Sequence, residues 1–223
     1  MNLHNKSAVV FDLDGTILDT IGDIAAAVNR AITAFGFKER TVAEVQSFLG
    51  NGSLVLIQRA IESEKPELCT TIRARFRKEY EHDMYSNTRA YCGIPELLSE
   101  LKASGVKVIV VTNKDDRCAK PMIERYFGNS VDICRGVVAD AERKPNPAVT
   151  LSVLSELGID PSNAVFVGDG MADLRVSKNA GIDFVPVGYG YTSPEKLFSE
   201  CGITPCANVQ ALRERLLEYI GVD

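Results

Sequence analysis

Runs of β-branched and apolar residues alternate with helix-like segments along most of this chain. Such runs lie at 7–12, 106–111, 164–167 and 182–187, with a weaker one at 131–139. Helical patterns are expected between and after them, at 94–104, 115–126, 147–157, 171–180, 194–200 and 207–220. Because this alternation is typical of parallel strands joined by crossover helices, the sequence predicts an α/β fold with a Rossmann-like, doubly wound parallel sheet.

One block interrupts the alternation directly after the first strand. Apolar residues such as Ile21, Ile24 and Val28 recur there every three or four positions, which is the spacing of a helix with one buried face. Helices are expected at 19–35, 41–48, 53–63 and 66–84. The sequence therefore predicts a helical cap domain, residues 19–86, inserted into an α/β catalytic core made of residues 1–18 and 87–223.

Composition narrows the class of protein. The chain has 223 residues, 45% of them hydrophobic, and a net charge of −5. An acidic chain without a basic stripe is not expected to bind nucleic acid. No apolar run is long enough to span a membrane and no signal peptide is recognisable, so a cytoplasmic protein is expected. A monomer or a homodimer is expected. The six cysteines form no Cys-x-x-Cys pair and are expected to be free thiols.

The first strand ends in Asp12-Leu13-Asp14-Gly15-Thr16. Side chains two residues apart on a strand point the same way, so Asp12 and Asp14 can converge, and Gly15 permits a sharp turn. Two close carboxylates repel each other, and a divalent cation relieves that repulsion. Asp12 could then act as a nucleophile and Asp14 in proton transfer. The plainer alternative is a pair of acidic residues in a turn.

Two further motifs could bind a phosphate. Thr112 and Asn113 follow the second strand and can donate hydrogen bonds to phosphate oxygens, although capping of the next helix would explain them too. Lys144, in Lys-Pro-Asn-Pro before a helix, can neutralise a phosphoryl group during transfer, although it could also be an exposed loop lysine. In doubly wound sheets ligands bind beyond the carboxyl ends of the strands, which favours the functional interpretation.

A second acidic pair follows the strand at 164–167. Asp169 lies at the strand end, and Asp173 lies four residues later, near the start of a helix. Oxygen ligands of this kind suit Mg²⁺, which keeps several waters and binds few protein carboxylates. Acidic residues are also favoured at a helix start by the helix dipole alone.

Taken together, the four motifs occur in an order and spacing that resembles the haloacid dehalogenase superfamily of phosphohydrolases. The likeness covers essentially the whole chain, and the Asp-Leu-Asp-Gly-Thr signature is its most specific part. The helical block resembles the cap that this superfamily inserts between its first and second motifs. The resemblance implies a phosphomonoester hydrolase that needs Mg²⁺, acts on a small phosphorylated metabolite and passes through a phospho-aspartate intermediate.

The same resemblance implies roles for individual residues. Asp12 would be the nucleophile, and Asp14 would be the general acid and then the general base. Thr112 would bind the phosphoryl oxygens, Lys144 would neutralise them, and Gly15 and Asn113 would lie against the substrate.

The metal ligands follow from the resemblance as well. Asp12, the backbone carbonyl of Asp14, and Asp169 would bind Mg²⁺, with Asp173 supporting it directly or through water. Gly170 stands where many relatives carry serine, which removes a hydroxyl but no metal carboxylate.

One short sequence in the predicted cap indicates a substrate class. Its Gly50-Asn51-Gly52 sequence, followed by Arg59 and Ala60, resembles a stretch of the bacterial phosphoglycolate phosphatases, as does Thr-Asn-Lys at 112–114. The three residues 50–52 are therefore expected to bind substrate, with phosphoglycolate or a similar compound favoured. A simple turn between helices is the alternative for Gly-Asn-Gly.

Two other functions fit the same fold. A phosphosugar mutase resembling β-phosphoglucomutase would keep the phospho-aspartate and return the phosphate to the sugar. A non-catalytic binding or regulatory protein would use a degenerate site, which the intact set of aspartates, threonine and lysine disfavours. A dinucleotide-binding enzyme is weaker still, because no Gly-x-Gly-x-x-Gly follows the first strand.

Overall fold

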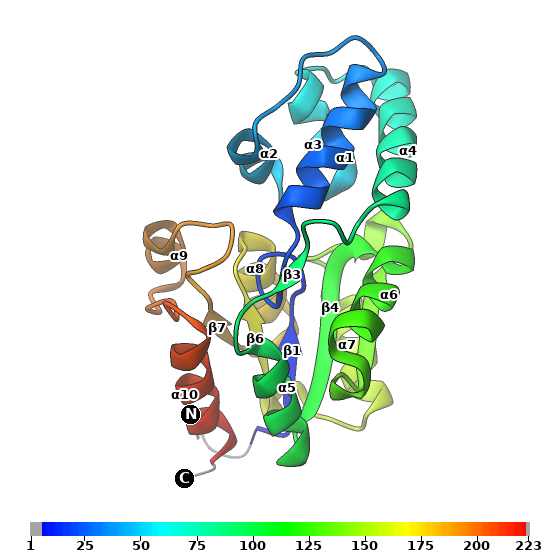
Figure 1. Ribbon diagram of the computed structural model, residues 1–223. Coiled ribbons are helices and arrows are strands. Elements are labelled where there is room, and N and C mark those ends of the chain that lie inside the picture. Colours follow the sequence, from blue (N-terminus) through cyan, green and yellow to red (C-terminus); the bar gives the residue numbers. More distant parts are fainter. Residues whose placement is uncertain (1–5, 222–223) are drawn as a thin grey trace. The chain divides into compact units, whose positions relative to one another are not determined.

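A computed structural model describes residues 6–221 of the chain (Figure 1). The chain divides into two compact units. One unit consists of the segment up to Ile17 together with everything from Ala90 onward, and the other runs from Leu18 to Arg89.

The first unit is built on a five-stranded sheet in the order β5-β4-β1-β6-β7. Neighbouring strands are parallel throughout. The strands are β1 (Ala8–Phe11), β4 (Lys107–Asp115), β5 (Ile133–Val137), β6 (Ala164–Gly168) and β7 (Asp183–Pro186). The central strands are buried apolar runs, because helices cover both faces of such a sheet. The predicted α/β fold with a doubly wound parallel sheet is confirmed.

Helices connect these strands (Figure 1). They are α5 (Ile94–Ala103), α6 (Asp116–Phe127), α7 (Ala148–Glu156) and α8 (Met171–Ala180), while α9 (Pro194–Cys201) and α10 (Val209–Ile220) follow the last strand, β7. One face of the sheet, including Val10, Ile109 and Phe166, packs with residues of α7 and α8 such as Leu154 and Leu174. Since crossovers between parallel strands are right-handed, α5 and α6 fall on the other face. Across residues 6–221, no helix is long and apolar enough to cross a membrane.

The second unit is helical, with α1 (Ile21–Thr33), α2 (Val42–Phe48), α3 (Gly52–Ile61) and α4 (Pro66–His82). Two short strands, β2 (Leu18–Asp19) and β3 (Arg89–Ala90), pair with each other where the chain enters and leaves it. Neither strand was expected, because a two-residue ladder leaves no periodicity to read. The six cysteines of the chain are free thiols.

A buried carboxylate joins the start of α1 to the segment at the end of the helical unit. Asp23, in the first turn of α1, is 1% exposed. It accepts hydrogen bonds of 2.9 Å from the backbone N–H and from the side-chain amide of Asn87. It accepts two more from Thr88, at 2.9 Å from the backbone and 2.7 Å from the hydroxyl. Burial opposes ionisation, but these hydrogen bonds outweigh it and hold the pKa of Asp23 below its ordinary value.

Replacing Asp23 with alanine is therefore expected to destabilise the helical unit by about 3 kcal/mol, because buried donors lose a charged acceptor. A depressed folded pKa means that this stabilisation is present above pH 4 and is lost as the pH falls through the folded pKa. Thermal unfolding followed by circular dichroism between pH 2.5 and pH 7 measures both effects. Glu39→Gln, at an exposed position of the same unit, is the control. Equal stability of Asp23→Ala and wild type at pH 7 would contradict the assignment.

Candidate active site

Three neighbouring strands bring the predicted motifs to one edge of the sheet. Asp12 follows β1, Thr112 lies in the last part of β4, and Asp169 follows β6. The backbone N–H of Asp12 still donates to the carbonyl of Val167, at 2.9 Å, so the ladder extends one residue beyond β1. Because these strands are parallel, their carboxyl ends coincide, and this is where the strand order reverses around β1.

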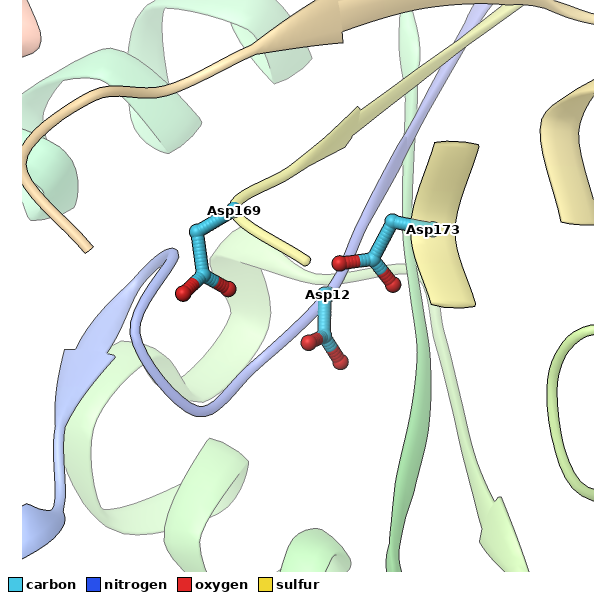
Figure 2. A group of neighbouring side chains, drawn as sticks. All are labelled: Asp12, Asp169 and Asp173. Carbon is cyan, nitrogen blue, oxygen red and sulfur yellow. The ribbon is translucent and has the colours of Figure 1, made fainter. Parts of the chain in front are cut away.

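Three carboxylates gather at this edge. Asp12, Asp169 and Asp173 each offer an oxygen, and the three oxygens lie within 4.8 Å of one another (Figure 2). Asp169 and Asp173 are buried, 4% and 2% exposed. The Oδ1 atom of Asp12 is buried and receives no well-directed hydrogen bond. The structure thus brings Asp12 of the first motif together with both aspartates of the fourth, while the carboxylate of Asp14 is not part of this cluster.

Lys144 lies against this acidic cluster. Its Nζ atom is 2.7 Å from Oδ1 of Asp12 and 2.7 Å from Oδ1 of Asp173. The same ammonium donates to the backbone carbonyl of Val111 at 3.0 Å. The Lys144 side chain is 4% exposed, so the alternative of an exposed loop lysine is wrong.

Burial and mutual repulsion make the cluster electrostatically costly. Burial, followed by the charge of Asp173, raises the pKa of Asp12 to about 6, and Lys144 acts in the opposite direction. Burial, followed by the charges of Asp173 and Asp12, raises the pKa of Asp169 to about 8. Burial disfavours the charged form of Lys144, but its two carboxylate partners outweigh this and raise its pKa.

A divalent cation fits this arrangement. Three ionised carboxylates and one ammonium leave a net charge of −2 in a buried space, which a single Mg²⁺ would balance. The donors are all oxygens, and Oδ1 of Asp12 receives no well-directed hydrogen bond although the Lys144 ammonium lies 2.7 Å from it. Such a donor set suits Mg²⁺ better than a softer metal.

Two loops pack closely against the carboxylate of Asp169 and hold it by hydrogen bonds. Its carboxylate accepts hydrogen bonds from the Thr16 hydroxyl, at 3.2 Å, and from the Tyr191 backbone N–H, at 2.7 Å. A Cβ atom at Gly190 would lie 2.3 Å from Cβ of Asp169, and one at Gly15 would lie 2.6 Å from its Oδ2. Both glycines are therefore needed for the loops to close on this carboxylate. Gly190 and Tyr191 had no assigned role in the sequence interpretation.

The motif after the second predicted strand differs from expectation. The strand was predicted to end at Val111, but β4 continues to Asp115, with a shift of register between those two residues. Such a bulge re-aims side chains while keeping the strand paired, and periodicity does not reveal it. Thr112, at 3% exposed, lies in this irregular part.

Asn113 holds the backbone of Lys144 from both sides. Its amide oxygen accepts from the N–H of Lys144 at 2.7 Å, and its amide nitrogen donates to the Lys144 carbonyl at 3.2 Å. Contact of Asn113 with a substrate stays a prediction. What its hydrogen bonds provide is a fixed position for the lysine.

Asp14 has a cationic partner of its own. The Nζ atom of Lys114 lies 2.8 Å from Oδ1 of Asp14, and the two side chains are 6% and 21% exposed. The sequence placed Lys114 in a family-like Thr-Asn-Lys stretch but gave it no role. Its position three residues after the predicted strand end was the only hint, and it gave no direction for the side chain.

Of the residues predicted in the helical unit, Gly50 and Asn51 lie between α2 and α3, and Gly52 is the first residue of α3. Gly50 and Gly52 have φ angles of +102° and +84°, which favour glycine. Asn51 precedes α3, is exposed, and its side chain makes no capping hydrogen bond. Substrate binding by these three residues stays a prediction.

Comparison with known proteins identifies the family. Residues 9–187 match the haloacid dehalogenase-like hydrolases, so the chain belongs to this family. It is 32% identical to phosphoglycolate phosphatase 1 of Pseudomonas aeruginosa, over 93% of this chain and 78% of that protein. It is 35% identical to the N-acetylmuramic acid 6-phosphate phosphatase of the same organism, over 87% of each.

Solved structures agree with this assignment. A crystal structure from Lactobacillus delbrueckii subsp. bulgaricus, of an inferred phosphoglycolate phosphatase, matches with a TM-score of 0.89 at 25% identity. The match covers 97% of this chain and 99% of that one. Together these comparisons place the protein among the phosphatases of the family, which are phosphoric monoester hydrolases.

Proposed function

We propose that this protein hydrolyses the phosphomonoester of a small organic acid, with Mg²⁺ as cofactor and Asp12 as the nucleophile. The observation that best supports the proposal is the position of Asp12, beside Lys144 and within reach of Asp169 and Asp173. A carboxylate beside a buried cation, in a cluster of oxygens that could hold a metal ion, suits attack on a phosphorus atom.

The metal would be held by Asp12, by Asp169 and by the backbone carbonyl of Asp14, with Asp173 supporting it directly or through water. When bound, it would relieve the repulsion among the carboxylates and withdraw charge from the phosphoryl oxygens. The raised pKa of Asp12, about 6, reflects burial and the charge of Asp173, and a bound cation would offset both.

The reaction then needs two proton transfers by one residue. An oxygen of Asp12 attacks phosphorus, the phosphorus–oxygen bond to the leaving group breaks, and Asp14 gives its proton to the leaving oxygen. Asp14 next takes a proton from water, whose oxygen attacks the phospho-aspartate and releases inorganic phosphate. Lys144 and Thr112 stabilise the negative oxygens of the transferring group throughout.

Two candidate substrates come from the relatives. One relative is named for phosphoglycolate and the other for N-acetylmuramic acid 6-phosphate, with comparable identity to this chain. Both compounds are phosphorylated organic acids. We therefore propose that the substrate is a phosphomonoester that also carries a carboxyl group, called an acid phosphate below. Phosphoglycolate is the first candidate.

A phosphate-release assay tests this proposal. Purified protein is given phosphoglycolate, N-acetylmuramic acid 6-phosphate, glucose 6-phosphate and β-glucose 1-phosphate, each with Mg²⁺ or with excess chelator. We expect an acid phosphate to give the highest kcat/KM, and chelation to lower the rate at least about 100-fold because the nucleophile loses its metal. Replacing Mg²⁺ by Ca²⁺ should also slow the reaction, because Ca²⁺ accepts more ligands at longer distances.

Three results would contradict parts of the proposal. Full activity after exhaustive chelation would exclude the metal role. Interconversion of phosphosugars without net phosphate release would identify a mutase. Faster hydrolysis of glucose 6-phosphate than of either acid phosphate would exclude the proposed substrate class.

A further inference from the structure

The site contains two buried lysines, and they contact different carboxylates. Lys144 touches Asp12 and Asp173, whereas Lys114 forms an ion pair with Asp14 at 2.8 Å. The Lys114 side chain is 6% exposed. A lysine is rarely buried without a partner, since its ammonium must recover the hydration that it loses. The charge of Lys114 is thus directed at the proposed acid–base residue.

The fold builds this contact through the bulge of β4. The register shift between Val111 and Asp115 adds residues to this strand and turns Lys114 away from regular pairing. The Lys114 backbone N–H donates to the Thr112 hydroxyl at 3.2 Å. On the neighbouring strand β5, a Cβ at Gly136 would lie 2.7 Å from the Lys114 carbonyl, so the bulge depends on that glycine.

We propose that Lys114 is a positioning residue, which holds the carboxylate of Asp14 in the orientation needed for proton transfer to the leaving oxygen. The inference rests on the proposed function, in which Asp14 is the general acid. Oδ1 of Asp14 accepts from Lys114, which leaves Oδ2 as the oxygen that would face the leaving group. Lys114 acts through Asp14, whereas Lys144 acts on the transferring phosphoryl group.

If Lys114 acts through Asp14, the rate lost on replacing Lys114 should depend on the leaving group. An alkoxide leaving group needs a proton in the transition state, whereas p-nitrophenolate is stable without one. General acid catalysis contributes roughly 10²- to 10⁴-fold to a rate, and a misplaced acid loses part of this. We expect Lys114→Met to lower kcat for an alkyl phosphate, phosphoglycolate or the best compound of the screen, by about 30-fold or more. For p-nitrophenyl phosphate the loss should stay below about threefold.

Further measurements separate positioning from phosphate binding or general damage. The inhibition constant of inorganic phosphate should change less than about twofold in Lys114→Met, because Lys114 does not touch the phosphoryl group. Lys114→Arg keeps a cation and should recover most of the alkyl phosphate rate. Lys120→Met is the matched control, because Lys120 pairs with Asp116 at the same 2.8 Å on the exposed surface of α6. It should behave as wild type on both substrates.

The possible outcomes are distinct. Equal losses on both substrates, or a weakening of phosphate inhibition by tenfold or more, would show that Lys114 binds the phosphoryl group and would overturn the inference. Lys114→Arg as slow as Lys114→Met on the alkyl phosphate, with a native circular dichroism spectrum, would also overturn it. No phosphate release from either substrate by the wild-type protein would contradict the proposed function itself, and the inference with it.

Discussion

Replacing Asp12 with asparagine should lower phosphate release on the order of 10⁴-fold or more, which corresponds to about 5.4 kcal/mol of transition-state stabilisation. The two side chains have nearly the same shape, so the fold should persist. An amide oxygen is a poor nucleophile and a poor metal ligand, so bond formation to phosphorus and metal binding are both lost. Lys144 would keep one carboxylate partner, Asp173, at 2.7 Å.

Two measurements check this prediction. Steady-state phosphate release gives the loss of turnover, and mass spectrometry of acid-quenched wild-type protein should find a single added phosphoryl group on Asp12. Asp160→Asn is the control, because Asp160 is an exposed residue whose side chain caps the Ser162 N–H, which asparagine also does. Turnover near the wild-type rate in Asp12→Asn, or a phosphoryl group on another residue, would exclude Asp12 as the nucleophile.

The fold was largely predictable because its signals are local. Buried parallel strands are short apolar runs, and β1 and β6 begin and end within about one residue of their predicted bounds. The strand predicted at 131–139 is shorter, Ile133–Val137, since only part of it pairs with β4. The β2–β3 pair depends on contact between segments far apart in the sequence, so no local sequence pattern predicts it.

The candidate site was predictable only where a residue stands at a strand end. Asp12 and Asp169 could be identified because an acidic side chain directly after a buried strand has few structural reasons to be there. Lys114 could not, because its direction depends on a bulge that Gly136 of another strand makes possible. Tyr191 could not be identified either. It contacts Asp169 through its backbone N–H, which every residue except proline has, so the residue type at this position does not indicate the contact.

Replacing Asp169 with asparagine should change stability and activity in opposite directions. In the metal-free protein the pKa of Asp169 is raised to about 8, above its ordinary 3.8. The folded state therefore holds this proton more tightly than the unfolded state, and stability is lost as the pH rises from about 4 to 8. Asparagine has no proton to lose. Its oxygen can accept from the Tyr191 N–H while its NH₂ donates to the Thr16 hydroxyl, so both contacts of Asp169 survive.

Metal-free Asp169→Asn should thus be about 5 kcal/mol more stable than metal-free wild type at pH 8, and nearly equal to it at pH 4. Thermal unfolding with excess chelator measures this as a rise in Tm of about 10–20 °C at pH 8. Added Mg²⁺ should raise the Tm of wild type much more than that of the variant, because the variant lacks a metal carboxylate. Phosphate release should fall on the order of 10³-fold. A variant less stable than wild type at pH 8 would show that the carboxylate is stabilising without metal. Equal Mg²⁺ shifts in both proteins would exclude Asp169 as a ligand, since a residue that binds the metal must couple metal binding to stability.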